Sequence, residues 1–177
     1  MGGIGGNRGL GRLAHLLALA VCCLVLANCS GGGKLDPKYG VSSSARVVEP
    51  GAPVPKGGGV YRVGKPYTIA GREYVPQEDI NYSAVGMASF YGNQFHGRYT
   101  ANGEVFDMNS ISAAHPTLPL PSYVRVTNLA NRRSIVVRVN DRGPFVEGRI
   151  IDLSLAAARA LGIADEGVAP VRLQTLE

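Results

Sequence analysis

Short runs of alternating apolar and polar residues fill the second half of the chain. In residues 134–140 a β-branched apolar residue stands at positions 135, 137 and 139, so these side chains share one face of an extended strand. Residues 123–128 alternate in the same way, and the five residues Leu-Ala-Asn-Arg-Arg at positions 129–133 join the two runs. The pattern therefore predicts a β-hairpin.

Further strands and one helix extend the pattern. Ser154 can cap a helix over residues 155–161, which Gly162 would end. About six short strands and one or two short helices within residues 83–177 favour a mainly β fold, a small closed barrel and not a sandwich. The remaining strands are predicted where β-branched and aromatic residues lie between Gly, Asn and Pro, at residues 84–91, 149–153 and 168–176.

The first 28 residues have the order of a secretory signal peptide. Arg8 and Arg12 precede an apolar run that is too short to span a bilayer comfortably. The run ends in Leu-Ala-Asn-Cys, which resembles the lipobox of bacterial lipoproteins, although Asn28 replaces the usual small residue. We therefore predict a lipoprotein signal peptide at residues 1–28, cleaved before a lipidated Cys29.

Gly, Ser and Pro dominate the next segment. Residues 29–59 contain two Gly triplets and one Ser triplet without a periodic apolar pattern, which predicts a flexible, disordered linker that tethers the domain. Residues 60–82 carry short mixed segments and predict an ordered lead-in. The barrel domain is then expected over residues 83–177.

Cysteine content and charge narrow the function classes. All three cysteines lie at or before position 29, so the folded part has neither a disulfide nor a thiolate metal site. The formal charge falls from +5 to +3 without the leader, because residues 1–28 hold two arginines and no acidic residue. Basic residues are scattered and Trp is absent, so nucleic acid is not an expected partner.

Three polar stretches interrupt the predicted strands. Glu104 follows a glycine in residues 95–104, His115 follows two alanines and precedes a proline, and Asp141 stands where an apolar strand ends. Taken alone, each residue favours a structural role over a chemical one: Glu104 as a solvated turn residue, His115 as a buried hydrogen-bonded histidine and Asp141 as part of an Asp turn.

Together the three residues favour cleavage of a glycosidic bond. That reaction needs a proton donor at the leaving oxygen and a negative or polar group near the developing positive charge. A carboxyl acts as an acid near neutral pH when burial raises its pKa. Hydrolase, zinc-peptidase, phosphate-loop and calcium-loop motifs are absent from the sequence, and neither a metal ion nor a cofactor is expected.

At these residues the sequence resembles the rare lipoprotein A family. Several independent motifs occur in one order over roughly residues 84–176. The family fold is a six-stranded double-psi β-barrel, similar to expansins and to endoglucanases of that barrel type. The motifs are GMASFYG at 86–92, FHGR at 95–98, TANGE at 100–104, FDM at 106–108, AAH at 113–115, TLP at 117–119, VRVTNL at 124–129 and VRVNDRGPF at 137–145.

The resemblance implies an endolytic peptidoglycan lytic transglycosylase. Such an enzyme cleaves the β-1,4 bond between N-acetylmuramic acid and N-acetylglucosamine without water, and the muramyl C6 hydroxyl closes a 1,6-anhydro ring. Carried over by motif, Asp141 is the acid/base, and Glu104 and His115 complete the pocket. The substrate contacts that it implies are Tyr91, Phe95, Thr100 and Asn140.

Two departures limit the resemblance. Tyr99 stands where many relatives have lysine or proline. Many members also carry a C-terminal SPOR domain, which this sequence lacks, so septal targeting and a preference for denuded glycan do not follow. Two alternatives to the transglycosylase stay open, a non-catalytic peptidoglycan-binding envelope lipoprotein and a conventional hydrolase.

The expected location is the cell envelope. Ser30 after the lipidated cysteine implies sorting to the outer membrane, with the lipid in its inner leaflet and the domain facing the periplasm. The expected partners are the glycan strands and the membrane, and contacts with cell-wall or division proteins are left open.

Overall fold

A computed structural model describes residue 2 and residues 42–176 of the chain. The predicted signal peptide, Cys29 and the first part of the predicted linker lie outside the described residues. Within the described residues, no helix combines the length and the apolar character needed to cross a membrane.

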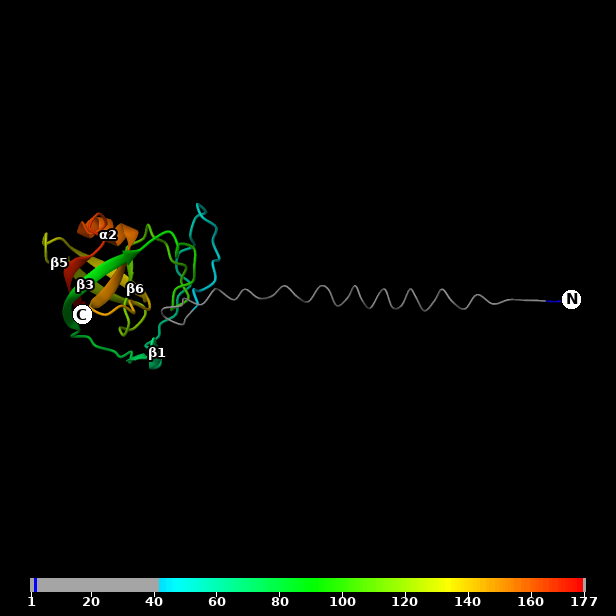
Figure 1. The fold of residues 1–177 in the computed structure, drawn as a ribbon, viewed down its shortest axis with the longest axis horizontal. Coiled ribbons are helices and arrows are strands. Elements are labelled where there is room, and N and C mark those ends of the chain that lie inside the picture. Colours follow the sequence, from blue (N-terminus) through cyan, green and yellow to red (C-terminus); the bar gives the residue numbers. More distant parts are fainter. Residues whose placement is uncertain (1, 3–41, 177) are drawn as a thin grey trace. The chain divides into compact units, whose positions relative to one another are not determined.

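Six strands close into a barrel, which confirms the predicted fold class (Figure 1). Around the barrel their order is β3, β7, β4, β6, β5, β8. The pairs β3–β7 and β4–β6 are parallel and the other neighbours are antiparallel. The strands are β3 (Ser83–Tyr91), β4 (Ser112–Ala114), β5 (Ser122–Asn128), β6 (Ser134–Asp141), β7 (Arg149–Ser154) and β8 (Ala169–Thr175).

The barrel interior is filled by alternate side chains of the long strands. Val137 and Val139 of β6 are fully buried beside Val124 and Val126 of β5, as the alternating pattern predicts. The helix α2 (Leu155–Leu161) is capped at its N-terminus by Ser154, whose hydroxyl accepts a hydrogen bond from the Ala157 N–H. It ends at Gly162, which has a left-handed backbone conformation. This helix packs on the same core.

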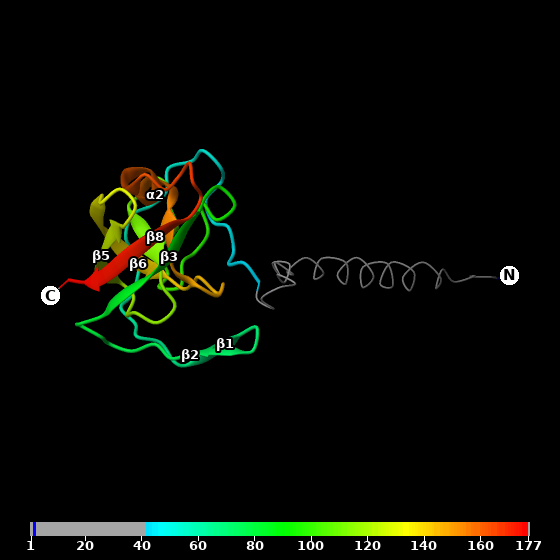
Figure 2. The same cartoon turned by 60° about the vertical axis from the view of Figure 1, so that its left-hand side comes forward.

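A small hairpin of β1 (Tyr67–Ile69) and β2 (Arg72–Tyr74) lies at the end of the barrel opposite to α2 (Figure 2). Tyr67 and Tyr74 stack on each other at 5.3 Å, and the ring of Phe145 meets both of them edge-on. Phe145 follows β6 closely, so the hairpin packs beside the loop that leaves Asp141.

Residues 42–63, here called the strap, run along the outside of the barrel. The amides of Val47 and Val48 both donate to the Gly97 carbonyl, and Arg62 exchanges two backbone hydrogen bonds with Leu120. A Cβ at Gly97 would stand 2.2 Å from the Val48 carbonyl oxygen, so only glycine fits this contact. The predicted boundaries of the linker and of the lead-in segment stay predictions.

Candidate active site

Asp141 ends β6 at the rim of the barrel. Its Oδ1 accepts hydrogen bonds from the backbone N–H groups of Ala101 and Arg142, both at 2.8 Å, and its carbonyl accepts from the His115 N–H. Burial raises the pKa of Asp141 to about 6, although the two N–H bonds and the charge of Arg142 act in the opposite direction. The carboxyl is therefore anchored through one oxygen and is partly protonated near neutral pH.

Asp141 lines an open hollow of about 510 Å³. Three predicted substrate contacts, Tyr91, Phe95 and Thr100, line the same hollow. Phe95 is exposed, whereas Tyr91 and Thr100 are buried. Aromatic rings with a few polar groups among them give this hollow the composition of a small-molecule binding site.

The Tyr91 hydroxyl is buried in this hollow without a hydrogen-bond partner in the described part of the chain. Its ring packs on Phe106 at 4.3 Å and meets Phe95 edge-on. Burial raises the pKa of Tyr91 well above its ordinary value, and the nearby carboxylates of Asp141 and Asp152 raise it further. The hydroxyl is therefore neutral and lies within electrostatic reach of two carboxyl groups.

Arg142 ties the site to its surroundings. Its guanidinium donates to the carbonyl oxygens of Val63, His115 and Leu118. One side chain thus joins the end of the strap to the segment that follows β4, directly beside the Asp141 carboxyl.

Glu104 lies in a different environment. Its carboxylate accepts from Arg138 Nη2 at 2.6 Å, from Asn140 Nδ2 at 2.8 Å and from Asn102 Nδ2 at 2.9 Å. Burial would raise the pKa of Glu104, but the hydrogen bonds from these three side chains outweigh it and hold the pKa below its ordinary value. Glu104 is therefore an ionised, fully bonded carboxylate.

Glu104 and Asn140 line a smaller hollow of about 280 Å³, together with Arg138 and Tyr123. Residues Pro55–Gly57 of the strap complete its wall. A Cβ at Gly59 would stand 2.6 Å from a Glu104 carboxylate oxygen, so the strap backbone lies directly against this residue.

His115 is almost completely buried, with 1% of its surface exposed. Its Nδ1 accepts from the N–H groups of Thr117 and Leu118, and its Nε2 lies 3.0 Å from the Tyr82 hydroxyl. Burial lowers the pKa of His115 to about 3, and the charge of Arg142 lowers it further. The ring is neutral, and it fixes the turn that follows β4.

The turn 100–104 connects the environments of the two carboxyls. Its Ala101 N–H holds Asp141, and its Asn102 side chain holds Glu104. The predicted residues thus fall into three neighbouring groups. Asp141 shares one hollow with Tyr91, Phe95 and Thr100, and Glu104 shares the smaller hollow with Asn140. His115 is buried, and its backbone N–H donates to the Asp141 carbonyl.

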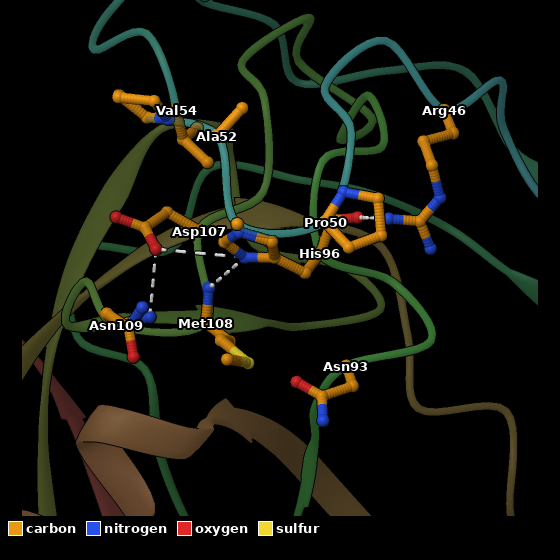
Figure 3. Close-up of a pocket in the computed structure, with 11 residues that line it drawn as sticks. Arg46, Pro50, Ala52, Val54, Asn93, His96, Asp107, Met108 and Asn109 are labelled. Carbon is orange, nitrogen blue, oxygen red and sulfur yellow. Dashed lines mark hydrogen bonds and ion pairs between the residues drawn. The ribbon is translucent and has the colours of Figure 1, made fainter.

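A third hollow, of about 530 Å³, lies between the strap and the barrel (Figure 3). Arg46 donates to the His96 carbonyl at its edge, and His96 Nδ1 accepts from the Met108 N–H. Asp107 on the same wall is bonded to the Lys56 ammonium at 2.7 Å. No cluster of three His, Cys, Asp or Glu side chains able to hold a metal ion occurs in residues 42–176.

Sequence reasoning missed three residues of the Asp141 hollow. Asp152 accepts from the Ser89 hydroxyl at 2.6 Å, and Arg149 donates to the same hydroxyl at 2.7 Å. Burial raises the pKa of Asp152, which Ser89 and Arg149 only partly offset. The available signal was an Asp inside the apolar strand 149–153, since carboxyls are rarely placed in such strands without a partner.

Comparison with known proteins places these residues in a wider group. The sequence model of a family described as lytic transglycolase matches residues 83–173. The chain is 54% identical over 126 residues to the endolytic peptidoglycan transglycosylase RlpA of Pseudomonas aeruginosa strain UCBPP-PA14, covering 71% of this chain and 36% of that protein. It is 42% identical over 161 residues to the protein of the same name from Pasteurella multocida strain Pm70, covering 89% and 52%.

The chain spans about a third to a half of the length of these curated relatives. Among solved structures, the Streptomyces papain inhibitor is similar, with 26% identity and a TM-score of 0.47 over 57% of this chain and all of that chain.

Proposed function

The chain belongs to the lytic transglycolase family, and on this basis we propose that its barrel is a peptidoglycan lytic transglycosylase, a carbon-oxygen lyase that acts on polysaccharide. It would cleave the β-1,4 bond between N-acetylmuramic acid and N-acetylglucosamine and leave a 1,6-anhydromuramic acid end. The observation that carries the proposal is the buried, partly protonated Asp141 in an open hollow lined by aromatic rings.

Asp141 would serve as acid and then as base. Its proton passes to the glycosidic oxygen as the bond to the muramyl C1 breaks. The C6 hydroxyl then attacks C1 and returns a proton to the same carboxylate. A carboxyl with a pKa of about 6 suits both steps near neutral pH, because either protonation state is accessible.

Glu104 and His115 would support this chemistry as positioning residues. Glu104 is ionised and bonded on both oxygens, and His115 is neutral and buried, so neither is placed to donate a proton in the Asp141 hollow. Glu104 orients the turn whose Ala101 N–H holds Asp141. We propose that Tyr91, Phe95 and Thr100 contact the sugar that binds in the Asp141 hollow. Asn140 would contact the part of the glycan that lies in the smaller hollow beside Glu104.

Purified protein on peptide-free glycan strands tests the proposal. We expect release of products with 1,6-anhydro ends, detected by mass spectrometry. Asp141→Asn should reduce the rate by at least about 100-fold while the variant still folds and unfolds in one cooperative transition. Reducing muramic acid ends would instead indicate a hydrolase, and binding without products would indicate a non-catalytic wall protein.

The rate should also depend on pH in a defined direction. Because Asp141 must be protonated to begin the reaction, the rate should fall about tenfold for each pH unit well above about 6. A rate that stayed constant from pH 6 to pH 8.5 would contradict the assignment of Asp141 as the acid.

We further propose that the protein is a lipid-anchored component of the cell envelope. Cleavage before Cys29 and acylation of that cysteine would place it in the inner leaflet of the outer membrane, facing the periplasm. Membrane fractionation of the wild type and of Cys29→Ser tests this, with release of the variant into the soluble periplasm as the expected result. Identical fractionation of both proteins would contradict the anchor.

A further inference from the structure

Asp141 and Asp152 lie on either side of the same residue. Ala114 of β4 pairs with Asp141 of β6 on one side and with Asp152 of β7 on the other. Neighbouring strands are spaced at ~4.8 Å, so the two Asp backbones are about 10 Å apart across a methyl side chain. Both Asp side chains line the same hollow.

This spacing suits two carboxyls that act on one glycosidic bond. Two side chains that start from such a distance and reach into one hollow can bring their carboxyls to the separation of roughly 5 to 9.5 Å that carboxyl pairs of glycoside-cleaving enzymes use. Ala114 lines the same hollow and packs with the buried rings of Tyr91 and Phe106, so the surface between the two strands is small and apolar.

One carboxylate oxygen of Asp152 is fixed by a hydrogen bond, and the other accepts no hydrogen bond from residues 42–176. Its Oδ1 accepts from the Ser89 hydroxyl, whereas its Oδ2 has, among residues 42–176, only the guanidinium of Arg149 nearby, at 3.6 Å. Ser89 is itself held by Arg149. A carboxyl that is anchored through one oxygen and open at the other is arranged to meet a substrate.

Two polar atoms beside Asp152 lack partners within residues 42–176. These are the Tyr91 hydroxyl and the Arg149 Nε, both fully buried. Buried polar atoms in folded proteins are nearly always hydrogen-bonded, so unpartnered ones around a hollow indicate a ligand with several hydroxyl or amide groups. A sugar ring provides such groups.

We infer that Asp152 is a second catalytic carboxyl, placed opposite Asp141 in one sugar-binding hollow; this inference rests on the proposed transglycosylase activity. As Asp141 gives its proton to O4 of the leaving N-acetylglucosamine, the bond from that oxygen to C1 breaks and positive charge develops on the muramyl ring. The Asp152 carboxylate faces this charge. O6 then bonds to C1 and its proton returns to Asp141, so Asp152 is unchanged after each turnover.

Asp152→Asn in the full chain tests the inference, with Asp165→Asn as the matched control on an exposed residue. The asparagine side chain keeps the size of the residue and can still accept from Ser89. We expect turnover at saturating peptide-free glycan to fall by about 100-fold, while binding of the strands changes by less than about threefold. The control should match the wild type.

Ser89→Ala provides a second variant. It removes the hydroxyl that orients Asp152 and should lower turnover about tenfold with little change in binding, so it decides the question if Asp152→Asn does not fold. Turnover within about threefold of wild type for the folded variant tested, or a loss that lies entirely in binding, would overturn the catalytic role of Asp152. If the wild type itself releases no 1,6-anhydro product, the proposed function fails and the inference falls with it.

Discussion

The surroundings of Glu104 and of Asp141 differ in what they do to a carboxyl group. Glu104 receives hydrogen bonds from Arg138, Asn140 and Asn102, which lower its pKa. Asp141 receives two backbone N–H bonds on one oxygen, and burial raises its pKa to about 6. The two residues are linked by one turn, yet one is locked as an anion and the other can exchange a proton.

This difference separates a structural carboxyl from a chemical one. A carboxylate that is paired and fully bonded stabilises the folded state, whereas a buried carboxyl without a close salt bridge destabilises its own charged form. The loss of stability that ionised Asp141 causes is compatible with function, because strongly shifted pKa values are typical of active sites. Opposite effects on stability are therefore expected when the two residues are neutralised.

The largest effect is expected for Glu104→Ala. The substitution leaves the partly buried guanidinium of Arg138 and the amides of two asparagines without their acceptor, so the free energy of unfolding should fall by about 3 kcal/mol. Urea denaturation at pH 7 measures this. Glu166→Ala, at an exposed position, is the control and should change stability by less than about 0.5 kcal/mol. Equal values for the two variants would remove the distinction drawn between Glu104 and a surface carboxylate.

Asp141→Asn should have the opposite sign. The folded protein binds a proton at Asp141 more tightly than the unfolded chain does, so this group contributes fully to stability below pH 3.8 and the contribution is lost as the pH rises through about 6. At pH 7.5 the asparagine variant should therefore be more stable than wild type, by up to about 3 kcal/mol. The advantage should shrink toward zero near pH 3.5.

Thermal unfolding of the wild type and of Asp141→Asn between pH 3.5 and 8 checks this dependence. Combined with the loss of activity predicted above, a gain in stability would mark Asp141 as a residue kept for chemistry at the expense of the fold. A variant that is less stable than wild type at pH 7.5 would show that Asp141 mainly holds the turn.

The sequence predicts the long elements well because their side chains alternate. Five barrel strands begin and end within one residue of the predicted bounds, and the helix matches at both ends because Ser154 and Gly162 cap it. The strand Ser112–Ala114 was not predicted, since three small residues are too few to show an alternation. Its place between β6 and β7 comes from long-range pairing, which a local pattern does not contain.

The candidate site could be predicted only in part, for a similar reason. Asp141 stands out because it ends an apolar strand, and Glu104 because it follows a glycine in a polar stretch. Their contrasting pKa shifts depend on Arg138 and on the fold of the turn 100–104. Asp152 lies within a strand that otherwise looks buried. Only the barrel register, which sets it beside Ala114, brings it into the same hollow as Asp141.

A smaller effect is expected for Asn140→Ala. The substitution removes one of the three side chains that donate to Glu104, so the free energy of unfolding at pH 7 should fall by about 1.5 kcal/mol. With one hydrogen bond fewer, the pKa of Glu104 should move up toward its ordinary value. Because a lowered pKa contributes stability above the unfolded value that is lost as the pH falls, acid unfolding of the variant should begin at higher pH than in wild type. An unchanged acid transition would mean that Arg138 and Asn102 keep Glu104 ionised without Asn140.

The smallest effect is the response to salt. Arg138 is about one-third exposed, with 33% side-chain accessibility, so the ion pair with Glu104 is partly screened by dissolved ions. Raising sodium chloride from 0.05 to 0.5 M should therefore reduce the contribution of this pair by roughly 0.5 kcal/mol or less. Asp141 forms no ion pair with any residue that the structure describes, so the gain in stability of Asp141→Asn at pH 7.5 should be nearly independent of salt. The loss of stability in Glu104→Ala should shrink as salt is raised. A double comparison of both variants at the two salt concentrations measures this, and an equal salt response would contradict the assignment of an ion pair to one site and a desolvated acid to the other.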